Sequence, residues 1–351
     1  MRSIQVGRHR IGPGEPVFII AEVGSNHNRS LRLARELIDV AAAAGADAVK
    51  FQTYSADALY SRYTPGLGYL RRHKLLKAGE SVHDLLARLE LPREWQKRLA
   101  EHCRRRKLLF LSTPFDLPAV DELDALGVPA FKIASFEINH IPLIEHAASK
   151  GKPLLISTGM ADLADIETAL AAAARRRNRE VALFHCAVNY PPRPQDINLR
   201  AMETMRLAFG VPVGFSDHTL GLAVPVAAVA LGARMIEKHF TLSRRLKGPD
   251  HPFALEPAEL AAMVRAVREA EQALGSSAKR RSAAEEELYR KARRGLVAAR
   301  AVSKGERLTR AKLAVKRPGF GISPVDLAKV VGRRAARDLR ADEILTWKLL
   351  D

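Results

Sequence analysis

The sequence has only two cysteines, Cys103 and Cys186, in its 351 residues. Two thiols without paired spacing form neither a disulfide framework nor a zinc site, so we expect both to be buried and reduced. No run reaches the roughly 18 uncharged apolar residues that a membrane-spanning helix requires. The opening MRSIQVGRHRIGPGEP has no apolar stretch after its basic residues and does not fit a secretory signal. We therefore expect a cytoplasmic protein that does not enter a membrane.

Aromatic residues are scarce at 6%, and none interleaves with the arginine clusters at 104–106, 175–177 and 333–334. Surfaces that bind single-stranded nucleic acid usually stack bases on aromatic side chains. The net charge of +18, from 57 Lys+Arg against 39 Asp+Glu, therefore favours an affinity for anionic substrates over nucleic-acid binding. A non-catalytic protein that binds polyanions through its surface charge is kept as an alternative.

Short β-branched apolar runs alternate with Ala- and Leu-rich amphipathic stretches from residue 17 to about residue 273. This pattern predicts parallel strands joined by crossover helices. The predicted strands are residues 17–21, 46–51, 108–111, 130–133, 153–156, 181–184, 211–215 and 234–238. The predicted helices are residues 30–44, 93–106, 118–126, 141–150, 162–177, 199–209, 222–231 and 257–274. Eight of each predict a (β/α)8 TIM barrel; a doubly wound sheet is the alternative, but the Gly-rich loop that would usually follow its first strand is missing.

Two stretches interrupt or follow this pattern. Residues 54–91 are longer than an ordinary βα loop and are expected to form either a partly helical lid beside the active site or a surface insertion. After Gly275 the composition becomes Ser, Lys, Arg and Glu with few apolar residues. We predict a barrel domain over 1–275, a linker over 276–294, of which 283–291 could be helical, and a small β-rich domain over 295–351.

Polar residues follow the predicted strands, where the active site of such a barrel lies. Lys50 and Lys132 would be costly to bury unpaired, so they imply carboxylate partners or an anionic ligand, and we favour the ligand. Hydroxyl side chains follow other strands and would add hydrogen-bond donors to a phosphate and a carboxylate, the two groups of phosphoenolpyruvate. They are Thr113, Ser135, Ser157 and Ser216. The alternative is a barrel aldolase in which Lys132 forms a Schiff base with a carbonyl substrate.

Two histidines, His218 and His239, follow adjacent predicted strands, so their imidazoles would lie side by side at the barrel mouth. Such a pair suits a divalent cation with open coordination positions. Nitrogen ligands favour Mn, Co or Zn, whereas Mg usually prefers oxygen. His27, His140 and His185 could also be ligands, but each is explained as well by a hydrogen-bonding role in a loop or the core.

Seven motifs, taken in order, closely resemble those of the sialic acid synthase (N-acetylneuraminate synthase) family, which includes pseudaminic and legionaminic acid synthases. They are EVGSNHN at 22–28, VKFQT at 49–53, STPF at 112–115, STGM at 157–160, GFSDHT at 214–219, IEKHFT at 236–241 and KRPGFG at 316–321. The last resembles the signature of the family's C-terminal antifreeze-like (SAF) domain. The resemblance covers nearly the whole chain, and its ordered set of motifs is specific.

The resemblance implies a reaction. Carbon C3 of phosphoenolpyruvate would attack the open-chain aldehyde of N-acetylmannosamine, water would add at C2, and phosphate would leave. The two histidines would hold Mn, with Mg or Co as alternatives. Glu22 would serve sugar hydroxyls and proton transfer, and Glu137 would bind or activate the attacking water. Asp250 would bind sugar hydroxyls, and Tyr190 would line the pocket.

The resemblance also implies a domain-swapped homodimer, in which Arg317 of the partner subunit's small domain reaches the sugar's N-acyl group. Two departures bear on the sugar. Val188 stands where the family often has a polar contact, and ASFEI at 134–138 is closer to pseudaminic acid synthases. N-acetylneuraminate synthase ranks first, and a pseudaminic or legionaminic acid synthase using a diacetamido hexose is the alternative.

Overall fold

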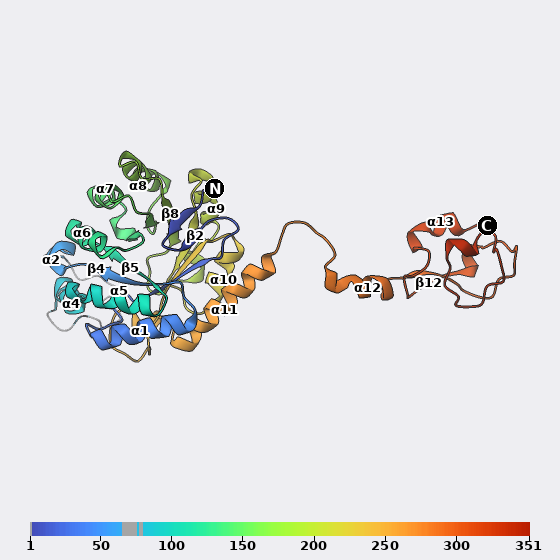
Figure 1. Ribbon diagram of the computed structural model, residues 1–351, viewed down its shortest axis with the longest axis horizontal. Helices are drawn as coiled ribbons and strands as arrows, with labels where there is room; N and C mark the ends of the chain where they lie inside the picture. Colours follow the sequence, from blue (N-terminus) through green and yellow to red (C-terminus); the bar gives the residue numbers. More distant parts are fainter. Residues whose placement is uncertain (1, 65–75, 77–79) are drawn as a thin grey trace. The chain divides into compact units, whose positions relative to one another are not determined.

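The computed structural model describes residues 2–64, 76 and 80–351, and the chain divides into two compact units, Met1–Gly275 and Ser276–Asp351 (Figure 1). Both cysteines are free and buried, as predicted. No helix in the described part of the chain has the length and apolar character needed to span a bilayer.

Unit 1 is the predicted barrel. Its eight parallel strands are β3 (Phe18–Glu22), β4 (Ala48–Thr53), β5 (Leu109–Pro114), β6 (Phe131–Ile133), β7 (Leu154–Ser157), β8 (Val181–Cys186), β9 (Val213–Asp217) and β10 (Met235–His239). They are hydrogen-bonded in the order β5-β4-β3-β10-β9-β8-β7-β6. The end strands β5 and β6 also contact each other, so the sheet forms a nearly closed barrel.

Helices follow the strands and pack around the barrel (Figure 1). They are α1 (Leu31–Ala44), α5 (Gln96–Arg105), α6 (Leu117–Leu126), α7 (Ile141–Ser149), α8 (Leu163–Arg175), α9 (Ala201–Phe209), α10 (Ala223–Ala230) and α11 (Pro257–Leu274). Local sequence fixes their ends. The Ser30 hydroxyl accepts from the Leu33 N–H at the start of α1, and Gly45, at φ +84, ends the same helix.

The barrel strands alternate between two apolar environments. Residues such as Ile19 and Val49 pack against the helices. Ile20, Ala48 and Leu155 instead fill the barrel interior near the amino ends of the strands. Because side chains alternate along a strand, the next inward positions after Ile20 and Ala48 belong to Glu22 and Lys50. The interior is therefore apolar at the amino ends of the strands and polar at the carboxyl ends.

A hairpin at the N-terminus of the chain closes the barrel at the amino ends of its strands. We did not predict this hairpin from the sequence. Strand β1 (Ile4–Val6) pairs antiparallel with β2 (His9–Ile11). Ile4, Val6 and Ile11 belong to the same apolar cluster as Ile20 and Ala48 inside the barrel. Three-residue strands are too short for a periodicity argument, which is why the hairpin escaped prediction.

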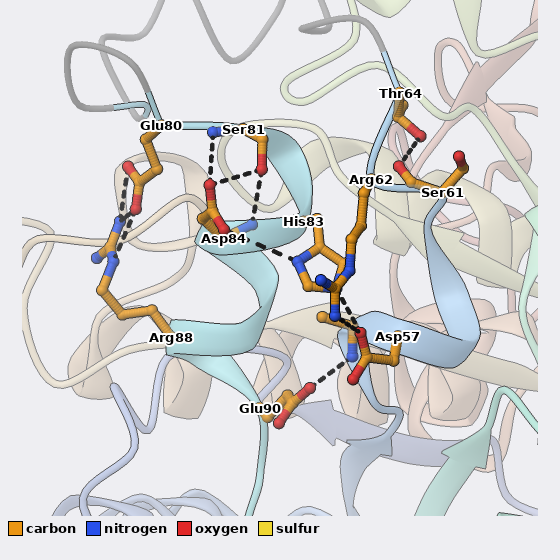
Figure 2. Close-up of polar contacts among 11 residues, drawn as sticks. Asp57, Ser61, Arg62, Thr64, Glu80, Ser81, His83, Asp84, Arg88 and Glu90 are labelled. Atoms are coloured by element: carbon orange, nitrogen blue, oxygen red, sulfur yellow. Dashed lines mark hydrogen bonds and ion pairs between the residues drawn. The ribbon is translucent and has the colours of Figure 1, made fainter.

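Residues 54–91, predicted to be partly helical, contain α2 (Ala56–Leu59) and α4 (Val82–Leu89). The prediction for 65–75 and 77–79 lies outside the described residues. Polar contacts join the two helices: Nε2 of His83 lies 2.9 Å from Oδ1 of Asp57, and the Ala56 N–H donates to Glu90 (Figure 2).

Unit 2 contains the remaining elements, which are α12 (Glu286–Lys291), β11 (Gly295–Ala298), β12 (Leu313–Lys316) and α13 (Leu327–Val330). Strands β11 and β12 pair antiparallel. Isolated bridges, for example between Val297 and Ile344, add further strand-like contacts. Leu296, Leu308 and Leu345 are buried in a separate apolar core, so unit 2 has a core of its own.

Candidate active site

A cavity of about 880 Å³ opens among the residues at the carboxyl ends of the barrel strands. Every site residue predicted within unit 1 lines it. They are Glu22, Lys50, Thr113, Lys132, Ser135, Glu137, Ser157, Tyr190, Ser216, His218, His239 and Asp250. The structure thus brings these twelve residues together. Arg317 lies in unit 2, directly after β12.

Lys50 is neutralised within the barrel. Its Nζ lies 2.8 Å from Oε2 of Glu22 and 3.8 Å from Oε2 of Glu237. Burial opposes the charge on this lysine, but the two carboxylates raise the pKa of Lys50. The other Glu22 oxygen accepts a hydrogen bond from Gln52 at 2.9 Å. The sequence left open whether Lys50 is paired with carboxylates or with an anionic ligand. In the structure it has carboxylate partners, and it needs no ligand to balance its charge.

Lys132 is placed differently. Its Nζ donates to the Ser157 hydroxyl at 2.6 Å, and the nearest carboxylate that it faces, Glu237, is 3.8 Å away. Burial is the main cause that lowers the pKa of Lys132, and the charge of Lys50 adds to it. This ammonium group is less well neutralised than that of Lys50, which makes it the better candidate to receive an anion.

Ser135 follows Lys132 by three residues, and two neighbours hold its hydroxyl in place. The Ser135 hydroxyl accepts from the Gly159 N–H at 2.9 Å and lies 3.1 Å from Sγ of Cys186. A Cβ at Gly159 would stand 2.9 Å from the Ser135 hydroxyl and 2.8 Å from Sγ of Cys186. Glycine at this position therefore lets the backbone approach the serine closely, and a larger residue would displace it.

Glu137 lies in a 3-10 turn directly after β6. Its Oε2 is buried and has no hydrogen-bond partner among the described residues. Burial raises the pKa of Glu137 to about 7, although the charge of Lys132 acts in the opposite direction. A carboxyl group with this pKa can accept or donate a proton near neutral pH.

His218 and His239 face each other with ring centroids 5.4 Å apart. Nδ1 of His218 lies 3.0 Å from the Ala187 carbonyl oxygen, so it must be the donor, and Nε2 keeps a lone pair. Burial and the neighbouring His239 lower the pKa of His218 to about 3, which keeps the ring neutral. Nδ1 of His239 is buried and has no hydrogen-bond partner among the described residues, and Oδ2 of Asp250 is 4.0 Å away from it.

These features fit a divalent cation bound through nitrogen. Neutral imidazoles are ligands for Mn, Co and Zn, and a hydrogen bond on the other ring nitrogen orients such a ligand. No group of three or more His, Cys, Asp and Glu side chains in the described residues is arranged to hold a metal. A cation held by His218 and His239 would therefore keep open positions for water or substrate.

Asp250 borders the histidine pair. Its Oδ2 accepts from the backbone N–H of Ser25 at 2.9 Å and from the Ser25 hydroxyl at 2.8 Å. Gly24, at φ +53, makes room for it, because a Cβ there would stand 2.6 Å from this oxygen and 2.9 Å from Cε1 of His239. The Tyr190 ring packs edge-on against His218 at 4.5 Å, so the loops after β3, β8 and β10 meet at one place.

The three other histidines that the sequence offered as possible metal ligands have structural roles. Nδ1 of His27 accepts from the Arg29 N–H, and Nδ1 of His140 accepts from the Leu143 N–H at the start of α7. Nε2 of His185 donates to the Ile197 carbonyl at 2.6 Å. None of these side chains is among the described residues that line the cavity, so the hydrogen-bonding explanation holds for all three.

Glu237 lines the cavity, although no role was assigned to it from the sequence. Glu237 accepts from the Ser216 hydroxyl at 3.0 Å and faces both buried lysines. Burial alone would raise its pKa, but Lys132 and Lys50 lower the pKa of Glu237 to about 2. Its inward position two residues before His239 was a signal available in the sequence.

The apolar side of α4 also lines the cavity, with Val82, Leu85, Leu86 and Leu89.

Two family models match the chain: the NeuB family over residues 37–279 and the SAF domain over residues 293–351. The N,N'-diacetyllegionaminic acid synthase of Legionella pneumophila is 40% identical over 344 residues, which cover 97% of this chain and 96% of that protein.

Solved structures agree in fold. The spore coat polysaccharide biosynthesis protein SpsE of Bacillus subtilis matches with a TM-score of 0.68 and 38% identity, covering 100% of this chain and 99% of that one. The N-acetylneuraminic acid synthetase of Leptospira borgpetersenii, in complex with citrate, matches with a TM-score of 0.71 and 36% identity, covering 82% and 94%.

Proposed function

The chain belongs to the NeuB family of phosphoenolpyruvate-dependent aldol-type synthases, and on this premise we propose that it condenses phosphoenolpyruvate with an N-acylated amino sugar. The product is a nine-carbon acid of the sialic acid type. One observation carries the proposal: a single cavity combines a weakly neutralised lysine near hydroxyl groups, a carboxyl group with a pKa of about 7, and two histidines whose rings face each other.

The anionic groups of phosphoenolpyruvate bind near Lys132, where hydroxyl side chains donate to them. The donors are Thr113, Ser135, Ser157 and Ser216. The electron pair of the C2–C3 double bond then forms a bond from C3 to the aldehyde carbon of the sugar, and the aldehyde oxygen takes a proton. Water adds at C2 and gives a proton to the Glu137 carboxylate. The bond from C2 to the phosphate oxygen breaks, the hydroxyl left at C2 gives its remaining proton to the departing phosphate, and C2 becomes a ketone. Glu137 returns its proton to solvent, which offsets the proton that the aldehyde oxygen took from solvent.

The cation is part of the proposal. His218 and His239, whose rings face each other, would hold Mn, with Mg or Co as substitutes. Such a cation polarises the aldehyde carbonyl toward attack. Glu22, fixed by Lys50 and Gln52, and Asp250, fixed by Ser25, orient the sugar hydroxyls.

The acceptor sugar is either N-acetylmannosamine, which the sequence ranks first, or a diacetamido hexose. Apolar side chains favour the second candidate, since Val188 and Phe136 both line the cavity and the Phe136 side chain is 54% exposed. A second acetamido group adds a methyl group that such side chains can cover. The relative from Legionella, named for a diacetylated acid, supports the same choice.

We also propose a homodimer in which Arg317 of one chain completes the cavity of the other. Large apolar side chains are exposed on the loops and helix starts at the carboxyl ends of the strands, as a surface covered by a second chain would require. They are Leu117, Phe136, Met160, Leu163 and Leu220. Phe320, three residues after Arg317, is 59% exposed in unit 2.

We propose a reducing, cytoplasmic setting for this protein, in keeping with its two free thiols.

The proposal is tested by phosphate release from phosphoenolpyruvate in the presence of Mn. The acceptors compared are N-acetylmannosamine, its 6-phosphate and the diacetamido hexoses that precede legionaminic and pseudaminic acids. We expect release with one acceptor class alone, a diacetamido hexose. Folded, metal-loaded protein that releases phosphate with none of them would overturn the function and leave the fold standing.

A further inference from the structure

Three consecutive residues at the end of β9 face three residues of β10 and alternate between the two faces of the barrel wall. The strand register pairs Ser216 with Glu237 and Asp217 with Lys238, and the ring of His218, directly after β9, faces that of His239. The first and third pairs face the cavity. The middle pair occupies the opposite face of the strands, because successive side chains point to opposite sides.

The middle pair is a fully buried ion pair. Nζ of Lys238 lies 2.5 Å from Oδ2 of Asp217, and the two side chains are 1% and 0% exposed. Asp217 and Lys238 immediately precede His218 and His239 in the sequence. The ion pair therefore links the backbone of the two strands one residue before each proposed metal ligand.

The same two side chains also fix the loop after His218. Oδ1 of Asp217 accepts from the Thr219 N–H at 2.8 Å, and Lys238 donates to the Thr219 carbonyl oxygen. His218 is thus enclosed between an anchored residue on each side. Its own Nδ1 donates to the Ala187 carbonyl, which leaves the ring little freedom to rotate.

Stability alone does not require this arrangement. An ion pair buried among apolar side chains loses its hydration on both charges, and a well-packed apolar pair of similar volume is often as stable. Neither Asp217 nor Lys238 is among the described residues that line the cavity, so neither can touch the substrate. What the pair does provide is a fixed separation between two neighbouring strands at the level of the histidines.

We propose that Asp217 and Lys238 are positioning residues that set the separation and orientation of His218 and His239, and through them the affinity for the divalent cation. This inference rests on the metal site of the proposed function. Removing such supporting contacts typically weakens metal binding about 10- to 100-fold. Lys132, Thr113, Ser135 and Ser157 lie on or after other strands, and Ser216, which lies on β9, keeps its own side chain and its bond to Glu237 when the pair is changed. We therefore expect the pair to act on the metal and not on phosphoenolpyruvate.

The test is a titration of metal-free protein with Mn²⁺, followed by the electron paramagnetic resonance signal of the free ion. The double variant Asp217→Asn/Lys238→Met removes both charges and keeps the volume. We expect its Kd for Mn²⁺ to rise about 10- to 100-fold, while the Kd for phosphoenolpyruvate, measured by calorimetry without metal, stays at the wild-type value.

A matched control removes an ion pair at the other end of the barrel. Asp47, just before β4, pairs with Arg268 at 3.0 Å, and its Oδ2 also accepts the Ile19 N–H. Asp47→Asn/Arg268→Met should leave the Kd for Mn²⁺ unchanged, whatever it does to the melting temperature. An equal rise in Kd in this control would attribute the effect to general loosening and overturn the proposal.

A second variant covers the case in which the double variant does not fold. Asp217→Glu keeps both charges and moves the carboxylate by one methylene, so weakened Mn²⁺ binding with unchanged phosphoenolpyruvate binding supports the proposal. Wild-type affinity for Mn²⁺ in either folded variant overturns it. If the wild-type protein itself binds no Mn²⁺, both the proposed metal site and this inference are wrong. If the wild-type protein binds Mn²⁺ and the variants bind it equally well, the inference alone is wrong, so the two failures are distinguishable.

Discussion

Glu22 and Lys50 form a buried ion pair inside the barrel, with Oε2 and Nζ 2.8 Å apart and side chains 1% and 4% exposed. Glu22→Gln leaves the ammonium group of Lys50 with the Thr113 hydroxyl at 3.1 Å and with Glu237, 3.8 Å away, as its carboxylate partner. We expect a loss of about 3 kcal/mol in the free energy of unfolding, at the lower end for breaking a buried pair, measured by urea denaturation.

The control for this loss is Glu22→Gln/Lys50→Met, which removes both charges. It should recover most of the stability yet remain inactive, because both residues line the cavity. Wild-type stability in Glu22→Gln would show that the ion pair contributes little.

The rate should depend on the ionisation of Glu137. Because the pKa of this group is raised to about 7 and the reaction uses its carboxylate, kcat/KM should fall as the pH drops through 7 and level off above it. Glu137→Gln should lose about 10²- to 10⁴-fold in kcat, typical for a general base, and its profile should lack this bend. A bend at the same pH in Glu137→Gln would assign the ionisation to another group.

Metal removal should abolish turnover reversibly. We expect a chelator to stop phosphate release and added Mn to restore it, whereas His218→Ala should stay inactive after Mn is added. Phosphoenolpyruvate should still bind in both cases, because its proposed ligands are not the histidines; calorimetry checks this. Full turnover in metal-free buffer would contradict the role of the histidine pair.

Val188 should influence the choice of sugar. Val188→Thr keeps the shape and adds a hydroxyl to the cavity wall, so the ratio of kcat/KM for N-acetylmannosamine to that for a diacetamido hexose should rise about 10-fold, the scale of a single pocket contact. The KM for phosphoenolpyruvate serves as the internal control. An unchanged ratio would remove Val188 from the specificity argument.

Mixing two inactive variants tests the dimer. In a mixed dimer of Arg317→Ala and His218→Ala chains, the cavity of the Arg317→Ala chain receives an intact arginine from its partner. Random assortment of a two-fold dimer should then restore roughly a quarter of wild-type activity. Each variant alone supplies the baseline. No recovery after verified subunit exchange would mean that Arg317 does not act across chains.

The amino-acid sequence was sufficient to predict the barrel and the polar residues at the carboxyl ends of its strands. Alternating strand and helix patterns located all eight strands, because burial on both faces of a parallel strand requires a continuous apolar run. The two-residue repeat then places Glu22, Lys50 and His239 inside, since each follows an inward apolar residue by an even number of positions.

The contacts among these groups could not be predicted from the sequence and follow from the folded barrel. Lys50 pairs with Glu22, whereas Lys132 bonds to Ser157, and Glu237 stands between the two lysines. These distances join different strands, and they depend on strand register and barrel closure, which no single segment encodes. The pKa of Glu137 likewise follows from burial by the whole fold. A sequence lists the groups that can react, and packing sets the distances that make them react.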